Sequence, residues 1–105
     1  VPARLHAWLG PCIGPQAFEV GADVLQAYGA SAAEPGAFFT PRTDVSSQPK
    51  WLGDLPGLAR ERLLRLGVAS VGGGSSCTYG DADRFFSFRR DRVTGLMLAA
   101  IACVA

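Results

Sequence analysis

Three cysteines and one histidine are the side chains in this sequence best suited to metal binding or nucleophilic catalysis. A zinc site needs three or four His, Cys or carboxylate ligands within about 2.0–2.3 Å of the ion. No HxxxH, CxxC or HxC spacing occurs around His6. In an extended strand His6 and Cys12 would stand about 20 Å apart, at about 3.3 Å per residue. We therefore expect no complete metal site in this chain, and we interpret His6 as a partly buried strand residue with satisfied ring nitrogens.

Cys77 has the surroundings that best favour a reactive thiol. It follows the glycine-rich run 72–76, and a thiol at such a turn becomes nucleophilic when an arginine or a helix N-terminus lowers its pKa. A nucleophilic cysteine also needs a base, and His6 is the one histidine of the sequence. Two interpretations stay open. Cys77 is either a small buried apolar residue, which we favour for all three cysteines, or the nucleophile of a cysteine hydrolase.

A second polar group, Ser87, Arg89 and Arg90, overlaps the aromatic run 85–88. Guanidinium groups beside a hydroxyl can bind phosphate or a ribose hydroxyl. On a strand, Arg89 and Arg90 would face opposite sides, so at most one of them would point with Ser87. An arginine here could instead fix a turn or pair with an acidic residue such as Glu19. Both interpretations remain open, and we interpret the phenylalanines of this run as core residues.

The hydrophobic pattern predicts the elements that must position these side chains. Alternating apolar residues favour strands, and apolar residues at helical spacing favour helices. Asp54 is suited to cap a helix whose leucines form one apolar stripe. The run Gly72–Ser76 should end a strand, because three successive glycines cannot hold a strand against their own backbone entropy. It lacks the Gly-Lys-Ser/Thr of a P-loop and a GxGxxG pattern, so we interpret it as a plain loop and not as a phosphate cradle. The expected elements are strands at 3–9, 68–71, 84–90 and 96–104, a brief strand or a core-filling turn at 37–40, and helices at 16–28 and 55–66.

These elements predict an α/β fold. We expect a partial layered α/β sandwich with a mixed sheet, two main helices and a C-terminal β-hairpin formed by the last two strands. A chain of 105 residues is long enough for one small domain with a core. Because the sequence opens without Met and enters a strand-like stretch at once, we expect residues 1–105 to be a single incomplete domain.

Composition excludes several classes of partner. Ten basic and nine acidic residues leave no strong field for nucleic acid or an anionic membrane, so neither partner is expected. The most apolar run, 95–105, is far shorter than the roughly 20 residues that cross a bilayer, and no targeting segment is visible. An odd number of widely spaced cysteines argues against a disulfide framework and favours a reducing compartment, the cytoplasm.

Two blocks of the chain carry a family pattern. They read GPCIGPQAFEVG at 10–21 and CTYGDADRFFSFRRDRVTG at 77–95. Together they resemble the C-terminal half of the YfiH-like laccase-domain proteins, which include the multicopper polyphenol oxidases. The chain departs from that pattern at Leu96, where an arginine is common, and in its alanine-rich final residues.

The resemblance implies a layered α/β sandwich and zinc-dependent purine nucleoside chemistry. That chemistry is phosphorolysis of adenosine, inosine and methylthioadenosine, with adenosine deamination, while an older label is copper-dependent phenol oxidase. The family's His, Cys and His metal ligands lie upstream of the matching part, so zinc or copper is implied for the parent protein and none for this chain alone. His6 does not inherit a ligand role, because Leu9 stands where the family's ligand motif has arginine.

The resemblance also implies roles for individual residues. Cys77, Ser87, Arg89 and Arg90 are candidates for the substrate pocket. Gly10, Pro11, Cys12 and Gly14 form the turn motif, and Glu19 is the expected partner of an arginine.

The favoured function is therefore the C-terminal portion of a metal-dependent purine nucleoside phosphorylase, inactive alone. Its implied partners are a purine nucleoside, phosphate and a missing N-terminal half. The alternatives are a non-catalytic interaction module that uses an exposed sheet edge, and a cysteine hydrolase using Cys77.

Overall fold

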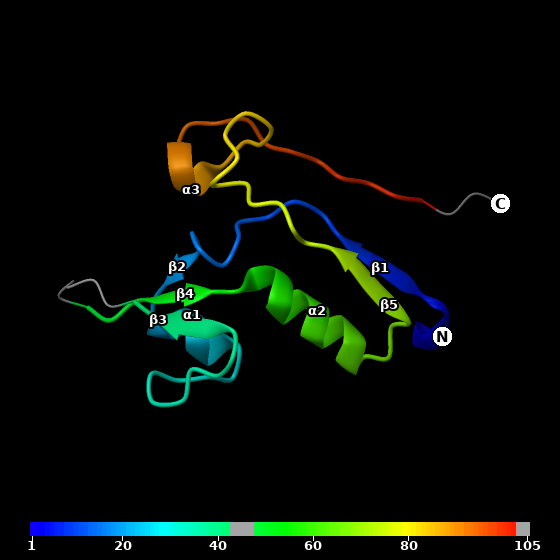
Figure 1. Ribbon diagram of the computed structural model, residues 1–105, viewed down its shortest axis with the longest axis horizontal. Coiled ribbons are helices and arrows are strands. Elements are labelled where there is room, and N and C mark those ends of the chain that lie inside the picture. The colour runs from blue at the N-terminus through cyan, green and yellow to red at the C-terminus, as the bar shows by residue number, and fades with distance from the viewer. Residues whose placement is uncertain (43–47, 103–105) are drawn as a thin grey trace.

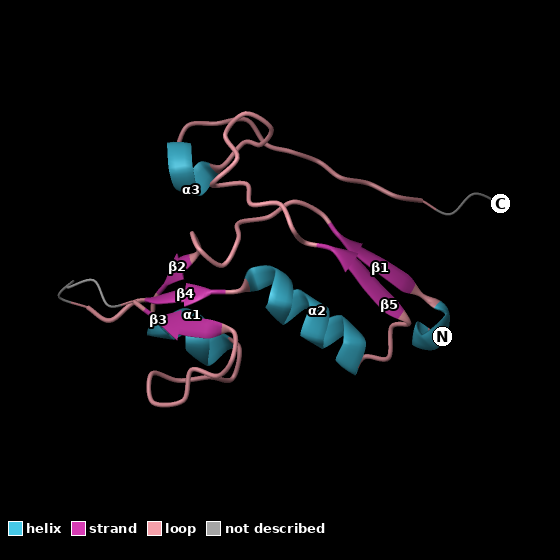
Figure 2. Ribbon diagram, in the orientation of Figure 1, coloured by secondary structure: helices cyan, strands magenta, loops and turns pink. Residues whose placement is uncertain are grey.

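The computed structural model describes residues 1–42 and 48–102. Its elements form two small sheets, with the longest helix, α2, running between them (Figures 1 and 2). In chain order they are η1 (Pro2–Arg4), β1 (His6–Leu9), β2 (Glu19–Val20), α1 (Ala22–Ala27), β3 (Phe39–Pro41), β4 (Trp51–Gly53), α2 (Leu55–Arg65), β5 (Ser70–Gly73) and α3 (Phe88–Asp91).

Parallel and antiparallel pairing both occur, in separate sheets. Strands β1 and β5 are parallel, with His6 opposite Ser70. Strand β4 is the centre of an antiparallel sheet, between β2 and β3. The α/β class predicted from the sequence is confirmed, and so are its two main helices, α1 and α2.

Helix α2 begins where the sequence predicts. The Asp54 carboxylate accepts a hydrogen bond from the Gly57 amide at 3.0 Å, which satisfies one of the free N–H groups of the first turn. Leu58 is buried on the side of the helix that meets the core. Arg60 donates from Nη2 to the Gly73 carbonyl at 2.8 Å, so α2 is tied to the end of β5 by a side chain as well as by packing.

The N-terminal elements are shorter than predicted. Strand β1 covers His6–Leu9, because the residues before it form a 3-10 turn. The helix expected at 16–28 begins only at Ala22. The Gly14 carbonyl closes a turn by accepting from the amides of Ala17 and Phe18, and the two residues of β2 then pair with β4. Strand β4 was absent from the predicted elements. The local pattern therefore could not show that residues 19–20 would pair with β4 instead of joining the helix.

The predicted C-terminal β-hairpin is wrong. Ser87 caps helix α3, since its Oγ accepts from the Arg90 amide at 3.3 Å, and the residues before it form turns. Residues 96–102 form no strand and extend away from the body (Figure 1), and 103–104 lie outside the described residues. A strand needs a backbone partner, and the described part of the chain offers none to this segment. Phe86 and Phe88 are 52% and 65% exposed, so the core interpretation of these two residues is also wrong.

Strand β5 differs from the predicted strand at 68–71 because it includes two glycines. It runs Ser70–Gly73, and it passes close to β1. Gly73 has a φ of +77°, and a Cβ there would overlap the Leu9 carbonyl oxygen. A glycine at this position therefore permits both the left-handed backbone and the close approach of the two strands.

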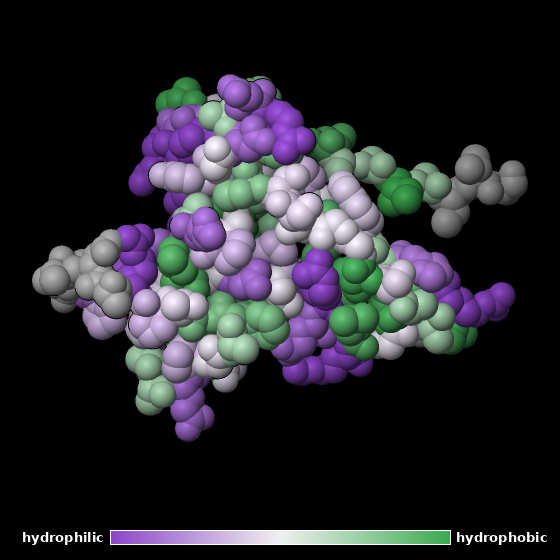
Figure 3. Space-filling model, in the orientation of Figure 1, coloured by the Kyte–Doolittle hydropathy of each residue, from purple (hydrophilic) through white to green (hydrophobic). Residues whose placement is uncertain are grey.

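The core is small and lies around the antiparallel sheet. It consists of Val20, Leu25, Phe39, Trp51 and Leu58. The radius of gyration is 15.7 Å, whereas a compact domain of about 100 residues has about 13 Å. In Figure 3 the chain has an uneven outline, with apolar atoms on the outstretched C-terminal segment. Among the described residues, no helix is long and apolar enough to cross a membrane.

Candidate functional site

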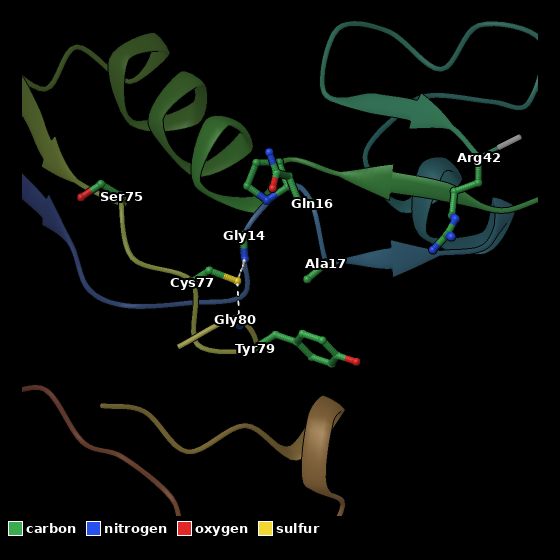
Figure 4. Close-up of a pocket in the computed structure, with 9 residues that line it drawn as sticks. Gly14, Gln16, Ala17, Arg42, Ser75, Cys77, Tyr79 and Gly80 are labelled. Atoms are coloured by element: carbon green, nitrogen blue, oxygen red, sulfur yellow. Dashed lines mark hydrogen bonds between the residues drawn. The ribbon is translucent and has the colours of Figure 1, made fainter. Parts of the chain in front are cut away.

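An open cavity of about 580 Å³ lies between the turn at 14–17 and the segment 75–80. Its volume is within the range of small-molecule sites, about 300–1,000 Å³. Ser75 and Arg42 stand at opposite ends of it, with the Cys77 sulfur between them (Figure 4). The lining residues are Gly14, Pro15, Gln16, Ala17, Arg42, Ser75, Cys77, Tyr79 and Gly80.

The cavity forms because the two sequence blocks that carry the family pattern meet in space. Cys12 and Cys77 are partners in an isolated parallel β-bridge. The Thr78 amide donates to the Cys12 carbonyl at 2.9 Å. This bridge continues the direction of the β1–β5 pair and holds the turn after Cys12 against the turn after Cys77.

Two backbone amides hold the Cys77 thiol at the cavity wall. Its Sγ accepts from the Gly14 amide at 3.2 Å and from the Gly80 amide at 3.4 Å (Figure 4). Partial burial acts to raise the pKa of Cys77, but hydrogen bonds from the amides of Gly14, Gly80 and Tyr79 outweigh it, so the pKa lies below its ordinary value. These donors stabilise the thiolate, the nucleophilic form of the residue.

Cys12 has the opposite electrostatic character. Burial raises the pKa of its thiol above the ordinary value, and the negative charges of Cys77 and Asp54 add to that rise. Cys12 therefore stays protonated in a pH range where Cys77 has begun to ionise. The structure distinguishes the two cysteines, which the sequence did not.

Gly14 leaves the space that the thiol fills. A Cβ on Gly14 would lie 3.1 Å from the Cys77 Cβ and 3.3 Å from its Sγ. Both distances are shorter than the roughly 3.5–4.0 Å of an optimal carbon contact. A glycine is therefore favoured at position 14 of the turn motif, because its backbone lies against the Cys77 sulfur and its amide donates to that sulfur.

Glu19 organises two arginines near the cavity. Its carboxylate accepts from Nη1 of Arg42 at 2.8 Å. Its carbonyl accepts from Nη1 of Arg89 at 2.8 Å, and the Arg89 guanidinium lies over the Phe18 ring at 5.4 Å. Arg42 lines the cavity, while Arg89 supports the strand beside it.

The side chains of Arg90 and Ser87 form hydrogen bonds with backbone groups. The Arg90 guanidinium donates to the carbonyls of Thr78, Tyr79 and Phe85 at 2.9, 3.1 and 3.0 Å. It also pairs with Asp91 at 2.8 Å, and its side chain is 19% exposed. These bonds fix the turn that brings Tyr79 to the cavity, and buried Ser87 caps the helix that carries Arg90.

Of the four predicted pocket residues, then, Cys77 lines the cavity, while Ser87, Arg89 and Arg90 lie outside its wall. The structure adds lining residues that the prediction missed, among them Gln16, Arg42 and Tyr79. Gln16 and Tyr79 fall inside the two family-pattern blocks, where their position was a usable signal. Arg42 follows a loop with no motif, and only the pairing of β3 with β4 brings it to the site.

A zinc or copper site would need several donor side chains grouped around one point. Among residues 1–42 and 48–102, no three His, Cys, Asp or Glu side chains are grouped so that they could hold a metal ion. Cys12 and Cys77 offer two sulfurs, and His6 lies apart on β1, where its Nδ1 is 2.6 Å from the Ser70 Oγ. His6 is exposed, so its predicted partial burial is wrong, although this ring nitrogen has a partner. The described side chains therefore do not fit such a site.

Comparison with known proteins places these features in a family context. Residues 1–104 match the family model described as multi-copper polyphenol oxidoreductase laccase. The chain is 47% identical over 100 residues to the protein named purine nucleoside phosphorylase YfiH in Shigella flexneri, and 46% identical to the one so named in Escherichia coli K12. Each alignment covers 95% of this chain and 39% of the relative.

A solved structure is also similar. The crystal structure of Neisseria meningitidis protein NMB0706 superposes with a TM-score of 0.66 at 39% identity. The match covers 86% of this chain and 36% of that chain. The chain thus spans about two fifths of the length of the relatives that it matches.

Proposed function

We propose, because this chain belongs to the multi-copper polyphenol oxidoreductase laccase family, that it forms part of a purine nucleoside phosphorylase. The names of its relatives support that activity. In phosphorolysis, phosphate attacks the anomeric carbon of the ribose while the bond to the purine breaks. The protein must hold the phosphate with cationic groups and stabilise charge on the departing base.

The observation that carries this proposal is the cavity that Arg42 and Tyr79 share with the Cys77 thiol. We assign phosphate binding to Arg42. A guanidinium has five N–H donors in a planar fork, so an ion pair with Glu19 is compatible with a further contact to a phosphate oxygen. Glu19 also fixes the direction in which the guanidinium points.

We assign base binding to Tyr79 and Gln16. The Tyr79 side chain is 39% exposed at the cavity, and an aromatic ring in that position can stack on a purine. The Gln16 amide carries both donors and an acceptor, which suits the edge of the base. Arg90 is then a positioning residue, because its bonds to the Thr78 and Tyr79 carbonyls hold the stacking ring in place.

The family resemblance implies a metal ion, and the proposal concerns which residues hold it. The described residues do not supply a donor set for zinc or copper, so we propose that the ion of the family protein is held by other residues. A bound ion would supply Lewis-acid chemistry. The residues of this chain would bind phosphate and base and exclude water from the cavity.

The remainder of the family domain has a natural place to pack. A parallel sheet is normally covered on both faces, yet Trp8 on β1 is 70% exposed. Leu96 and Leu98 are 91% and 92% exposed on the segment that extends from the body. We propose that these exposed apolar side chains are covered by the part of the domain that the relatives have in addition, which would also complete the cavity.

A chimera tests the proposed function. This chain would replace the matching 100 residues of the Escherichia coli relative, and release of hypoxanthine from inosine would be measured with varied phosphate. We expect activity in the chimera and none in the isolated chain. Arg42→Ala in the chimera should raise the KM for phosphate about tenfold or more, as expected for a lost charge-assisted contact.

The matched control is Arg65→Ala. Arg65 is also an arginine paired with a glutamate, Glu61, but it lies on α2 away from this cavity. Its replacement should leave the phosphate KM unchanged. A folded chimera without phosphate-dependent base release, or equal effects of the two substitutions, would contradict the assignment.

The cysteine-hydrolase alternative is less well supported. Among the described residues that line the cavity, none is a histidine or a carboxylate that could serve as the base for Cys77. The interaction-module alternative would use the same exposed apolar side chains, and activity of the chimera would separate it from the phosphorylase proposal.

A further inference from the structure

Cys12 and Cys77 lie opposite each other on neighbouring extended segments, at a strand spacing that a disulfide bond can span. They are direct partners in a parallel β-bridge, and both are free cysteines. Neighbouring strands lie about 4.7–4.9 Å apart, inside the roughly 4.4–6.8 Å between Cα atoms that a disulfide spans. Both side chains are partly exposed, so small reagents can reach them.

The two thiols have different environments. Cys77 lines the cavity, and its sulfur accepts from the Gly14 and Gly80 amides. Cys12 is held by the Thr78 amide on its carbonyl and has no place in the cavity wall. The Cys77 thiol is therefore open to a reagent in the cavity and is stabilised as a thiolate. The Cys12 thiol lies beside it in the protonated form.

We propose that Cys12 and Cys77 form a peroxide-responsive thiol pair, in which Cys77 is oxidised first and Cys12 then closes an intramolecular disulfide. The Cys77 thiolate attacks one oxygen of hydrogen peroxide, which gives Cys77 sulfenic acid and hydroxide. The Cys12 sulfur then attacks the Cys77 sulfur. The S–O bond breaks, and the Cys12 proton leaves with the hydroxyl group as water. In sum, two thiols and one peroxide give one disulfide and two waters.

Oxidation would alter the cavity itself. In the disulfide, the Cys77 sulfur is drawn toward Cys12, which competes with its hydrogen bonds to the two amides. The Gly14 and Gly80 amides would then lose the Cys77 sulfur as their hydrogen-bond acceptor. A thiol pair of this kind is compatible with a reducing compartment, where disulfides are transient and regulatory.

The test uses the whole chain with Cys103→Ser, which removes the cysteine that lies outside the described residues. The protein is treated with low concentrations of hydrogen peroxide, and its intact mass and disulfide map are followed in time. We expect loss of the mass of two hydrogen atoms and a Cys12–Cys77 peptide link. Dithiothreitol should restore the original mass.

Single substitutions separate the two roles. In Cys12→Ser, a sulfenic acid should accumulate at Cys77 and be trapped by dimedone. In Cys77→Ser, oxidation of Cys12 should be slower by about tenfold or more, since a protonated thiol is a poor nucleophile. The same comparison in concentrated urea controls for the fold, and there the two single variants should react at equal rates.

Three outcomes would overturn the proposal. They are equal rates for the two variants in the native protein, disulfides formed only between chains, and a disulfide that forms no faster in the native protein than in urea. The first would remove the special role of Cys77, and the other two would remove the paired geometry.

Discussion

Replacement of Gly14 by alanine should disrupt the thiol site and leave the backbone conformation allowed. Gly14 is absent from the glycines with positive φ, so alanine introduces no strain in the backbone. Its Cβ would nevertheless stand 3.1 Å from the Cys77 Cβ and 3.3 Å from its Sγ. Cys77 must move by a few tenths of an ångström, and its sulfur then loses part of the hydrogen bond to the Gly14 amide.

The expected cost follows from three opposing effects. Overpacking of a methyl group costs about 1–3 kcal/mol, and the weakened hydrogen bond adds about 0.5–1.5 kcal/mol. The reduced entropy of the unfolded chain offsets about 0.4–1 kcal/mol of that cost. We expect a net loss of about 2 kcal/mol, which corresponds to a Tm lower by about 8–16 °C for a domain of this size.

Thermal unfolding of the 105-residue chain followed by circular dichroism measures this loss. Gly10→Ala is the matched control, because the nearest atom to its added Cβ is in Trp8 at 3.9 Å, an ordinary contact. In a Cys77→Gly background the cost of Gly14→Ala should fall to within about 0.5 kcal/mol of zero, since the atoms it overlaps are gone. An unchanged cost in that background, or an equal loss for Gly10→Ala, would refute the steric explanation.

Other consequences can be measured on the same chain. The pKa of Cys77 is lowered in the folded state. The free energy of unfolding should therefore rise as the pH rises from that lowered value to the ordinary thiol range. Urea titrations should show this rise in the native protein and not in Cys77→Ser. Arg90→Ala should lower the denaturant midpoint clearly, since it leaves the carbonyls of the turn without their donor. Arg84→Ala should lower it far less, because it removes only the exposed ion pair between Arg84 and Asp81. Equal losses in denaturant midpoint would contradict this difference. Ser87→Ala should cost about 1 kcal/mol through the lost cap of α3, and Ser87→Asp should retain most of the stability.

Helix α2 was predicted correctly from the local sequence pattern, whereas the C-terminal segment was not. Asp54 and the leucines after it predicted α2 correctly, because a capping side chain and an apolar stripe act within one helix. The run 84–90 has strand-like alternation, yet the Ser87 cap and the tertiary bonds of Arg90 select a turn and a short helix instead. Alternation does not reveal whether a partner strand exists.

The sequence by itself determined the family, the α/β class, the position of α2 and the importance of the segments around Gly14 and Cys77. These depend on residue type and on interactions between near neighbours. Only the tertiary structure decided that Arg42 lines the cavity while Arg90 holds a turn, and that the thiols of Cys12 and Cys77 differ. Those properties arise from contacts between residues far apart in the chain, and burial, amide direction and strand pairing exist only once the chain is folded.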